Sequence, residues 1–489
     1  MPSTKKKRTT SKSKSAAKNS RAAAKTKPRA AKRSARSTAA GTTPQTPTPP
    51  PAYFLSLTVQ NVRCFGPEQT LHLTNPQGRP AQWTMILGDN GTGKTTLLQS
   101  IVALVPTGDV IDSGEEDMSD VLTPRCFHHS TEVSDWHPFR DERGGGVPYL
   151  KATFFRGNLA GGGTGQASGD FLVEGDITSG WTYAELSEDV MPVVCFGYGA
   201  SRRVGKTSLS DNKDEDDFAS LFSDEGALLN AEEWLLQADY AARAAADAAT
   251  RSHAEKRRDD IKNVLIRLLP DVEEIRFTQI TTERMKPSIE VRTPYGWVPI
   301  QDLSLGYKTL IAWIVDFASR MFERYPWSEN PLAEAAVVLV DEIDLHLHPR
   351  WQRELVGFLS ELFPNTQFIA TTHSPLVVQA ATEANLVVLR REGDHVIIDN
   401  EVVSVDGWRV DQILTGEPFG LESARPPHLD SLLAARREIL SRGTMTPRDR
   451  SRLRDIQAEM GGLPAGETPE EMKALDIISR AAARIRGKD

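Results

Sequence analysis

Residues 83–104 read WTMILGDNGTGKTTLLQSIVAL, and the rest of the chain is interpreted outward from this stretch. The opening WTMIL is apolar enough to predict a short buried strand, and the closing TLLQSIVAL predicts a helix. Between them, Gly88 to Thr95 match the pattern G-x4-G-K-[ST], whose glycines let backbone N–H groups face phosphate oxygens at a helix N-terminus. The order of strand, glycine loop and helix therefore predicts a nucleotide phosphate site in an α/β fold.

The residue types in this loop suit ATP with Mg²⁺. We expect Lys94 to neutralise the β- and γ-phosphates and the Thr95 hydroxyl to bind the metal. A glycine-rich turn without function is the alternative, and the flanking strand and helix argue against it. The predicted ATP-binding residues are Asp89, Asn90, Gly91, Thr92, Gly93, Lys94, Thr95 and Thr96.

A second apolar strand, residues 337–340, ends in two acids. We expect Asp341 to hold Mg²⁺ and Glu342 to act as the general base for the attacking water. Paired acids after a strand can also be a solvated turn, a weaker interpretation in a chain that has a phosphate loop. Further along, FIATTHSP puts His373 at the end of another apolar strand, where it is expected to contact the γ-phosphate rather than to be purely structural.

The stretch QDLSLGYK, which contains Ser304 and Gly306, stands before a predicted helix and upstream of the acidic strand. A glycine loop, LSxG, a strand ending in DE and a histidine, in this order, resemble the ABC-ATPase superfamily. The resemblance implies an ATPase head with a mostly parallel central sheet and antiparallel N-terminal strands. It also implies a head-to-tail homodimer or higher oligomer, in which Ser304 and Gly306 face the ATP held by the partner.

The sequence departs from the superfamily pattern in two places. The usual LSGGQ reads LSLGY, with Leu305 and Tyr307 in place of Gly and Gln. The usual glutamine loop has no candidate either, since Gln166 lies in a Gly-rich hairpin and the strand PVVCFGYGASR contains no Gln. The residue that would couple Mg²⁺ to the regulatory lobe is therefore unassigned.

The stretch DEIDLHLHP, residues 341–349, resembles RecF, OLD and related bacterial ATPases that act on DNA, rather than transporter subunits. The resemblance places Asp344 at the subunit interface. His346 and His348 alternate as in a strand, and we interpret them as packing and capping residues rather than a metal pair. The later GWRVDQILTGEPFGL is similar to ATPases of the Septu anti-phage system, which implies a separate HNH nuclease subunit. The part of the chain after His373 lacks the acidic cluster that a toprim nuclease domain would need.

The chain is expected to divide into five parts, with a helical insertion and a helical C-terminal extension around the ATPase head. These are a disordered basic tail, the N-terminal part of the head with an insertion at about 106–190, a helical insertion, the C-terminal part of the head and a helical C-terminal region. Their expected ranges are 1–51, 52–223, 224–270, 271–423 and 424–489.

Charge is distributed unevenly along the chain. The formal net charge is −8, but residues 1–51 contain 14 Lys and Arg and no acid, which leaves 44 basic and 66 acidic residues in the remainder. Such a tail suits nucleic acid, or it serves as a solubilising tail; a transit peptide is a weaker possibility. Three cysteines without a CxxC motif and the lack of a long apolar run predict a cytoplasmic protein without membrane contact.

Two weaker patterns remain open. Cys126, His128, His129 and His137 fit no standard zinc spacing, so a metal site there is disfavoured. The apolar stripe at residues 429, 432, 433, 435 and 439 indicates a helix that packs on its own domain or docks a partner.

Three functions follow from these patterns. The favoured one is an ATPase whose dimer closes on ATP and thereby regulates a nuclease partner. The alternative is a RecF-like repair or recombination ATPase that binds DNA itself. A transporter's ATPase subunit is the third, and the DEIDLHLHP stretch and the basic tail argue against it.

Overall fold

The computed structural model of the protein describes residues 51–107, 123–124, 148–157, 159, 171–176, 180–183, 193–204, 217–224, 226–269, 271–278, 281–282, 285–442, 445–460 and 477. Its centre is a six-stranded sheet in the order β18-β17-β3-β16-β15-β9. The inner strands run parallel and β18 is antiparallel to β17. The strands are β3 (Trp83–Gly88), β9 (Cys195–Tyr198), β15 (Ala336–Val340), β16 (Thr366–Thr371), β17 (Asn385–Glu392) and β18 (His395–Asp399).

The central sheet is buried on both faces, which explains why its strands are continuously apolar rather than alternating. Along β15, Val338 and Val340 join one hydrophobic cluster, whereas Val337 and Leu339 join the other. Successive side chains of a strand point to opposite faces, so each strand contributes to both cores. The prediction of a mostly parallel central sheet is confirmed.

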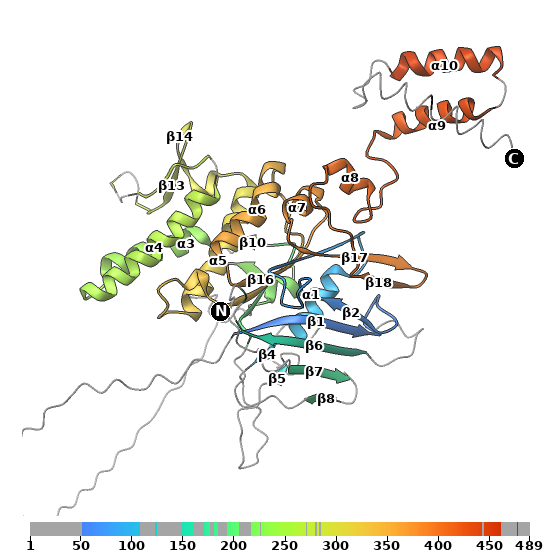
Figure 1. Ribbon diagram of the computed structural model, residues 1–489. Coiled ribbons are helices and arrows are strands. Elements are labelled where there is room, and N and C mark those ends of the chain that lie inside the picture. Colours follow the sequence, from blue (N-terminus) through green and yellow to red (C-terminus); the bar gives the residue numbers. More distant parts are fainter. Residues whose placement is uncertain are drawn as a thin grey trace, which may run out of the picture. The chain divides into compact units, whose positions relative to one another are not determined.

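Helix α1 (Lys94–Ala103) and a five-stranded antiparallel sheet contribute to the cluster on one face. This second sheet has the order β2-β1-β6-β7-β8 (Figure 1). Part of the segment expected as an insertion therefore belongs to it, because β6 pairs with both β1 and β7. Its strands are β1 (Ala52–Gln60), β2 (Gln69–His72), β6 (Tyr149–Arg156), β7 (Phe171–Asp176) and β8 (Gly180–Tyr183).

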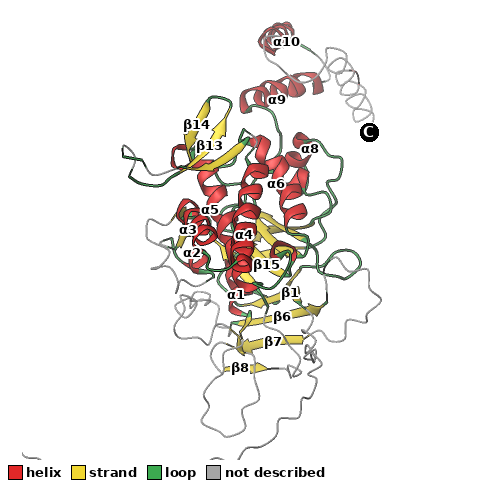
Figure 2. Ribbon diagram, turned by 90° about the vertical axis from the view of Figure 1, so that its left-hand side faces the viewer, coloured by secondary structure: helices red, strands yellow, loops and turns green. Residues whose placement is uncertain are grey.

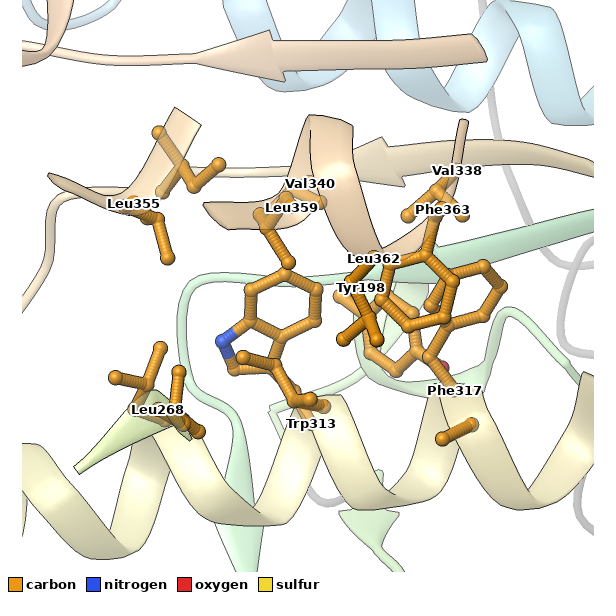
Figure 3. Close-up of a cluster of buried hydrophobic side chains, with 14 of the residues drawn as sticks. Tyr198, Leu268, Trp313, Phe317, Val338, Val340, Leu355, Leu359, Leu362 and Phe363 are labelled. Atoms are coloured by element: carbon orange, nitrogen blue, oxygen red, sulfur yellow. The ribbon is translucent and has the colours of Figure 1, made fainter. Parts of the chain in front are cut away.

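Helices cover the other face of the central sheet, as Figure 2 shows from the side. The central one is α5 (Leu305–Arg324), whose Trp313 and Phe317 point toward Val338, Val340 and Phe363 (Figure 3). The stretch expected to be helical over roughly 225–269 is a pair of helices, each begun by a side-chain cap, Asn230 or Asp247. The other helices on this face are α3 (Ala231–Ala244), α4 (Ala248–Leu268), α6 (Pro349–Leu362), α7 (Pro375–Ala380) and α8 (Val410–Thr415), whereas α2 (Ala219–Phe222) packs in the cluster that contains α1.

Smaller strand pairs complete the described elements. Between α4 and α5, a three-stranded antiparallel sheet has the order β12-β13-β14. Two further pairs are short, β4 with β5 and β10 with β11. The bounds are β4 (Pro106–Thr107), β5 (Thr123–Pro124), β10 (Arg203–Val204), β11 (Ala227–Leu228), β12 (Glu274–Phe277), β13 (Ile289–Thr293) and β14 (Gly296–Pro299).

The C-terminal helices α9 (Pro427–Ser441) and α10 (Pro447–Met460) have a small core of their own. Leu429, Leu432 and Ile439 of α9 are buried with Ile456 of α10 in a cluster separate from the two clusters of the central sheet. The apolar stripe of α9 is thus covered mainly by α10. No described helix is long and apolar enough to cross a bilayer.

Candidate functional site

The glycine loop joins β3 to α1 at the carboxyl edge of the central sheet. Gly93 adopts a left-handed φ of 87° as the residue before α1, and a Cβ there would come within 2.4 Å of Cys64 Sγ. Lys94 follows; it is buried, and its Nζ donates to the carbonyl oxygens of Gly88 and Asp89, both at 2.9 Å. The ammonium group is therefore held inside the curve of the loop, where a phosphate would be bound.

Burial lowers the pKa of Lys94, and the carboxylates of Asp341 and Glu342 act in the opposite direction. The other predicted loop residues surround it: Asp89, Asn90 and Gly91 are exposed, Thr92 and Thr96 are buried, and Thr95 is half-buried. The loop thus presents an exposed tip to solvent and a buried cation at its base.

A chain of hydrogen bonds connects the glycine loop to the acidic strand end. Thr95 Oγ1 donates to Asp341 Oδ2 at 2.6 Å, and Thr371 Oγ1 donates to the other carboxylate oxygen, Oδ1, also at 2.6 Å. The parallel register of β15 beside β16 and β16 beside β3 brings these three side chains to one edge. The two oxygen-bearing groups predicted to hold Mg²⁺, Thr95 and Asp341, are therefore in direct contact.

Glu342 has an unusual backbone, because its φ of 47° lies in the left-handed region. This conformation costs a non-glycine residue about 1 to 3 kcal/mol and persists only where neighbouring groups enforce it. The Glu342 N–H donates to Thr371 Oγ1 at 2.7 Å, and its carbonyl oxygen accepts from Arg202 Nη2. The residue expected as the general base is thus held at both ends of its peptide backbone.

Arg202 also belongs to this site, although it is not among the residues predicted to bind ATP or Mg²⁺ or to act in catalysis. It is 3% exposed and follows β9, the strand beside β15. Its Nη2 also donates to the Asp341 carbonyl oxygen at 2.9 Å. Burial lowers the pKa of Arg202 to about 10, which still leaves the guanidinium charged at neutral pH.

Asp344 and His373 lie together next to the acids. The Asp344 carboxylate oxygen Oδ1 accepts from Thr372 Oγ1 at 2.6 Å and from the His373 backbone N–H at 3.2 Å. Gln352 donates to the Asp344 carbonyl oxygen at 3.4 Å and accepts from Ser374 Oγ at 2.7 Å. His373 itself is exposed at the end of β16. Asp344 therefore orients the histidine backbone within its own chain, a contact that the sequence analysis did not foresee.

The signature residues lie apart from the phosphate loop, at the start of α5. Ser304 caps this helix by accepting from the Tyr307 N–H at 3.5 Å. A Cβ on Gly306 would come within 2.4 Å of the His346 carbonyl oxygen, so this position requires glycine even within one subunit. Ser304, Gly306 and Tyr307 line a groove of about 330 Å³ whose lining includes none of the phosphate-loop residues.

The alternation of the two histidines is typical of a strand. In the structure, however, His346 lies in a turn after the acidic strand and His348 lies directly before α6. His346 has a left-handed φ of 64°, and its carbonyl oxygen approaches Gly306. His348 Nδ1 accepts from the Arg350 N–H at 3.3 Å and caps α6, as expected. Among the described residues no group of His, Cys, Asp and Glu is arranged to bind a metal. The Cys126 and His128 pattern lies outside the described residues.

The arrangement suits a nucleoside triphosphate with a divalent cation. The left-handed glycines leave an open tip, since a Cβ on Gly91 would meet no atom within 4 Å. Behind that tip lie the buried ammonium of Lys94 and the hydroxyl and carboxylate of Thr95 and Asp341, which are the oxygen donors that Mg²⁺ prefers. Glu342, half-buried, is the next residue along the chain, and a carboxylate is a group that can accept a proton.

Two family models match the chain. Residues 56–159 match an AAA domain, and residues 199–379 match an AAA domain described as a putative AbiEii toxin of a type IV toxin–antitoxin system. Together the two matches contain the glycine loop, the signature, the acidic strand end and His373.

Several known proteins are similar to this chain. The Septu protein PtuA of Bacillus mycoides is 26% identical over 416 residues, which are 83% of this chain and 50% of that protein. The chain therefore spans about half the length of this relative. The retron Vc95 probable ATPase of Vibrio cholerae is 49% identical over 92 residues, 19% of this chain and 18% of that protein.

Among solved structures, an Smc head bound to the C-winged helix domain of ScpA is 16% identical, with a TM-score of 0.39, and covers 71% of this chain and 97% of that one. The motif order and the strand order agree with an ATPase head that contains the two AAA matches. The chain is similar to Septu PtuA and to retron ATPases.

Proposed function

We propose that the chain binds ATP with Mg²⁺ and hydrolyses it, and that this cycle regulates a partner that acts on nucleic acid. The observation that carries the proposal is the continuous set of hydrogen bonds from Thr95 through Asp341 and Thr371 to Glu342. It links the loop that would bind the phosphates to the backbone N–H of Glu342, the residue whose carboxylate would accept a proton. A purely structural glycine turn would not require this contact with two acids.

The residues divide the work of hydrolysis between them. Backbone N–H groups of the glycine loop and the Lys94 ammonium bind the phosphates and offset their charge. Thr95 and Asp341 hold Mg²⁺, which when bound neutralises negative charge that develops on the phosphates. Glu342 orients a water molecule and accepts its proton. His373, at the end of β16, contacts the terminal phosphate.

The test separates binding from hydrolysis. Lys94→Ala removes the cation beside the phosphates, so ATP binding measured by equilibrium titration should be lost. Glu342→Gln keeps the shape of the side chain but not its basicity, so ATP should bind normally while turnover falls by on the order of 10²- to 10⁴-fold. Wild-type affinity in Lys94→Ala would refute the phosphate-site assignment. Normal turnover in Glu342→Gln would remove Glu342 from the role of base.

We further propose that two heads associate head to tail. In support, Ser304 and Leu305 are exposed, with Leu305 64% exposed, and the groove beside them lies apart from the glycine loop of the same chain. In such a dimer, the γ-phosphate of the ATP bound by the partner subunit would lie at this groove. Glu342→Gln incubated with ATP and Mg²⁺ should then double in mass by light scattering, and Ser304→Arg in the same background should stay monomeric. A monomeric Glu342→Gln protein at saturating ATP would contradict the proposal.

The partner is proposed to be a nuclease subunit of the HNH type, on the strength of the similarity to Septu PtuA. Co-expression with the product of the adjacent gene and co-purification would test this assignment. The second candidate, a repair ATPase that binds DNA directly, is supported by the 14 basic residues of the N-terminal tail. Tight DNA binding by the chain alone, unchanged by any co-expressed subunit, would favour this second function.

A further inference from the structure

Arg202 is nearly inaccessible to solvent, yet its side chain reaches the backbone of both predicted active-site acids. Its Nη2 donates to the Asp341 carbonyl oxygen at 2.9 Å and to the Glu342 carbonyl oxygen. Among the described residues, its Nε has no hydrogen-bond partner. A buried guanidinium with an unsatisfied nitrogen is unfavourable by itself. Another contribution must therefore offset the cost of burying Arg202. Its hydrogen bonds are to the turn that carries Glu342.

Glu342 is held from two opposite sides. Thr371 accepts from its N–H at 2.7 Å, whereas Arg202 donates to its carbonyl oxygen. The φ of 47° that results lies where a side-chain-bearing residue is strained. Without either contact, the backbone of Glu342 would be expected to relax toward ordinary turn angles, and the direction of its carboxylate would change with it.

The segment that carries Arg202 is itself tightly placed. The Tyr198 carbonyl oxygen accepts from the Asp341 N–H at 2.8 Å, and the Gly199 N–H donates to Ser220 Oγ at 3.2 Å. A Cβ on Gly199 would come within 1.8 Å of the Ser220 carbonyl oxygen, so the chain passes α2 in close contact. Arg202 therefore extends from a fixed backbone, which is what a positioning role requires.

We propose that Arg202 is a positioning residue for ATP hydrolysis: together with Thr371 it fixes the backbone of Glu342, so that the carboxylate faces the attacking water. The inference rests on the proposed function, because it acts through Glu342. Arg202 touches neither nucleotide nor water in this scheme. Its loss should slow turnover while ATP affinity is kept.

The experiment uses the full-length chain. Arg202→Met keeps most of the side-chain volume and removes the donor, and a displacement of the base by about 1 Å is expected to lower kcat about 100-fold. ATP affinity should stay within about threefold, since no phosphate-binding group is altered. Arg202→Lys retains a cationic donor and should recover part of kcat. Thr371→Val removes the contact to the Glu342 N–H and also the hydrogen bond to Asp341 Oδ1, and it should lower kcat as well.

The matched control is Arg257→Met. Arg257 is a half-buried arginine whose buried Nε also lacks a partner among the described residues, but it lies on α4 against the rings of Trp234 and Phe322. Its replacement should affect thermal stability and leave kcat unchanged. Comparable losses of kcat in Arg257→Met and Arg202→Met would reduce Arg202 to a general stability residue and overturn the proposal.

The decisive measurement is the double variant Arg202→Met/Glu342→Gln in single-turnover hydrolysis. If Arg202 acts through Glu342, the second substitution should change the residual rate of Glu342→Gln less than twofold. A further 100-fold loss would show that Arg202 acts elsewhere, and wild-type kcat in Arg202→Met would also overturn the inference. Failure of the proposed function would look different, because Glu342→Gln alone would then hydrolyse ATP at the normal rate.

Discussion

The edge of the head that carries the glycine loop, the phosphate-loop edge, differs from the edge that carries Ser304 and Gly306, the signature edge. The two differ in how many contacts to their predicted functional side chains come from the same chain. At the first, Asp341 is 5% exposed and both of its carboxylate oxygens are engaged by threonine hydroxyls. At the second, Ser304 and Leu305 are exposed beside an open groove. At the first edge, contacts within the chain already fix the predicted functional side chain. At the second edge, the predicted functional residues are exposed. Damage to the two edges should therefore have different consequences.

Asp341→Asn should produce the largest effect, because it damages the phosphate-loop edge. The amide retains the shape of the side chain but loses the charge that would hold Mg²⁺ and one of its acceptor oxygens. We expect steady-state hydrolysis to fall by on the order of 10²- to 10³-fold. Magnesium titration of the ATPase rate is the measurement. An unchanged rate and magnesium dependence would contradict the assignment of this edge.

Gly306→Ala should have a smaller effect that is confined to the signature edge. The added methyl group would meet the His346 carbonyl oxygen at 2.4 Å, so the start of α5 must shift against the turn. Hydrolysis is expected to fall about tenfold, which corresponds to roughly 1.4 kcal/mol, while ATP binding by the separate subunit is retained. Gly357→Ala on α6 is the control, since a Cβ there meets nothing within 4 Å. Loss of ATP binding in Gly306→Ala would remove the distinction between the two edges.

Asp316→Ala tests the core that connects the edges. Its carboxylate accepts from Tyr198 Oη on β9 and from Arg320 Nε on α5, both at 2.8 Å, and is almost completely buried. Burial lowers the pKa of Arg320 and the ion pair with Asp316 raises it, so that removing Asp316 leaves this half-buried guanidinium paired with Asp217 alone. We expect the free energy of unfolding to fall by about 3 kcal/mol in denaturant titration. A loss below 1 kcal/mol would mean that water replaces the carboxylate.

Removing residues 1–51 should leave both edges unaffected. The deleted segment contains no large apolar residue other than Met1, so the ATPase rate and the midpoint of thermal unfolding are expected to stay within error. Nucleic-acid affinity should decrease, and its dependence on salt concentration should become weaker because fewer counterions are released. Equal salt slopes with and without these residues would assign the tail to solubility instead.

Ending the chain near residue 423 should have the smallest effect on the ATPase. Helices α9 and α10 share a small core that is separate from the clusters of the central sheet. Their removal should therefore spare ATP binding, and any change should be in the mass measured by light scattering. An unfolded product would show that the helices stabilise the head, and unchanged mass and partner binding would exclude a role in assembly.

Much of the nucleotide edge could be predicted from local sequence. The glycine loop requires consecutive residues, and a run of apolar residues that ends in Asp341 and Glu342 identifies a strand and its tip without knowledge of its neighbours. The parallel sheet then brings the carboxyl ends of β3, β15 and β16 together. The same local reasoning does not extend to the conformation of His346, because a left-handed turn after the strand cannot be predicted from the spacing of two histidines.

Only the tertiary structure decided which residues far apart in the chain contact each other. Arg202 donates to a carbonyl oxygen 140 positions away, and Thr95 and Asp341 meet across 246 positions. Backbone carbonyl oxygens are the same chemical group in every residue, so no pattern of side chains reveals that a buried arginine will bind them. The sequence by itself determined which groups could do the chemistry, and folding determined which of them are held in place, because only packing brings distant donors and acceptors within 3 Å.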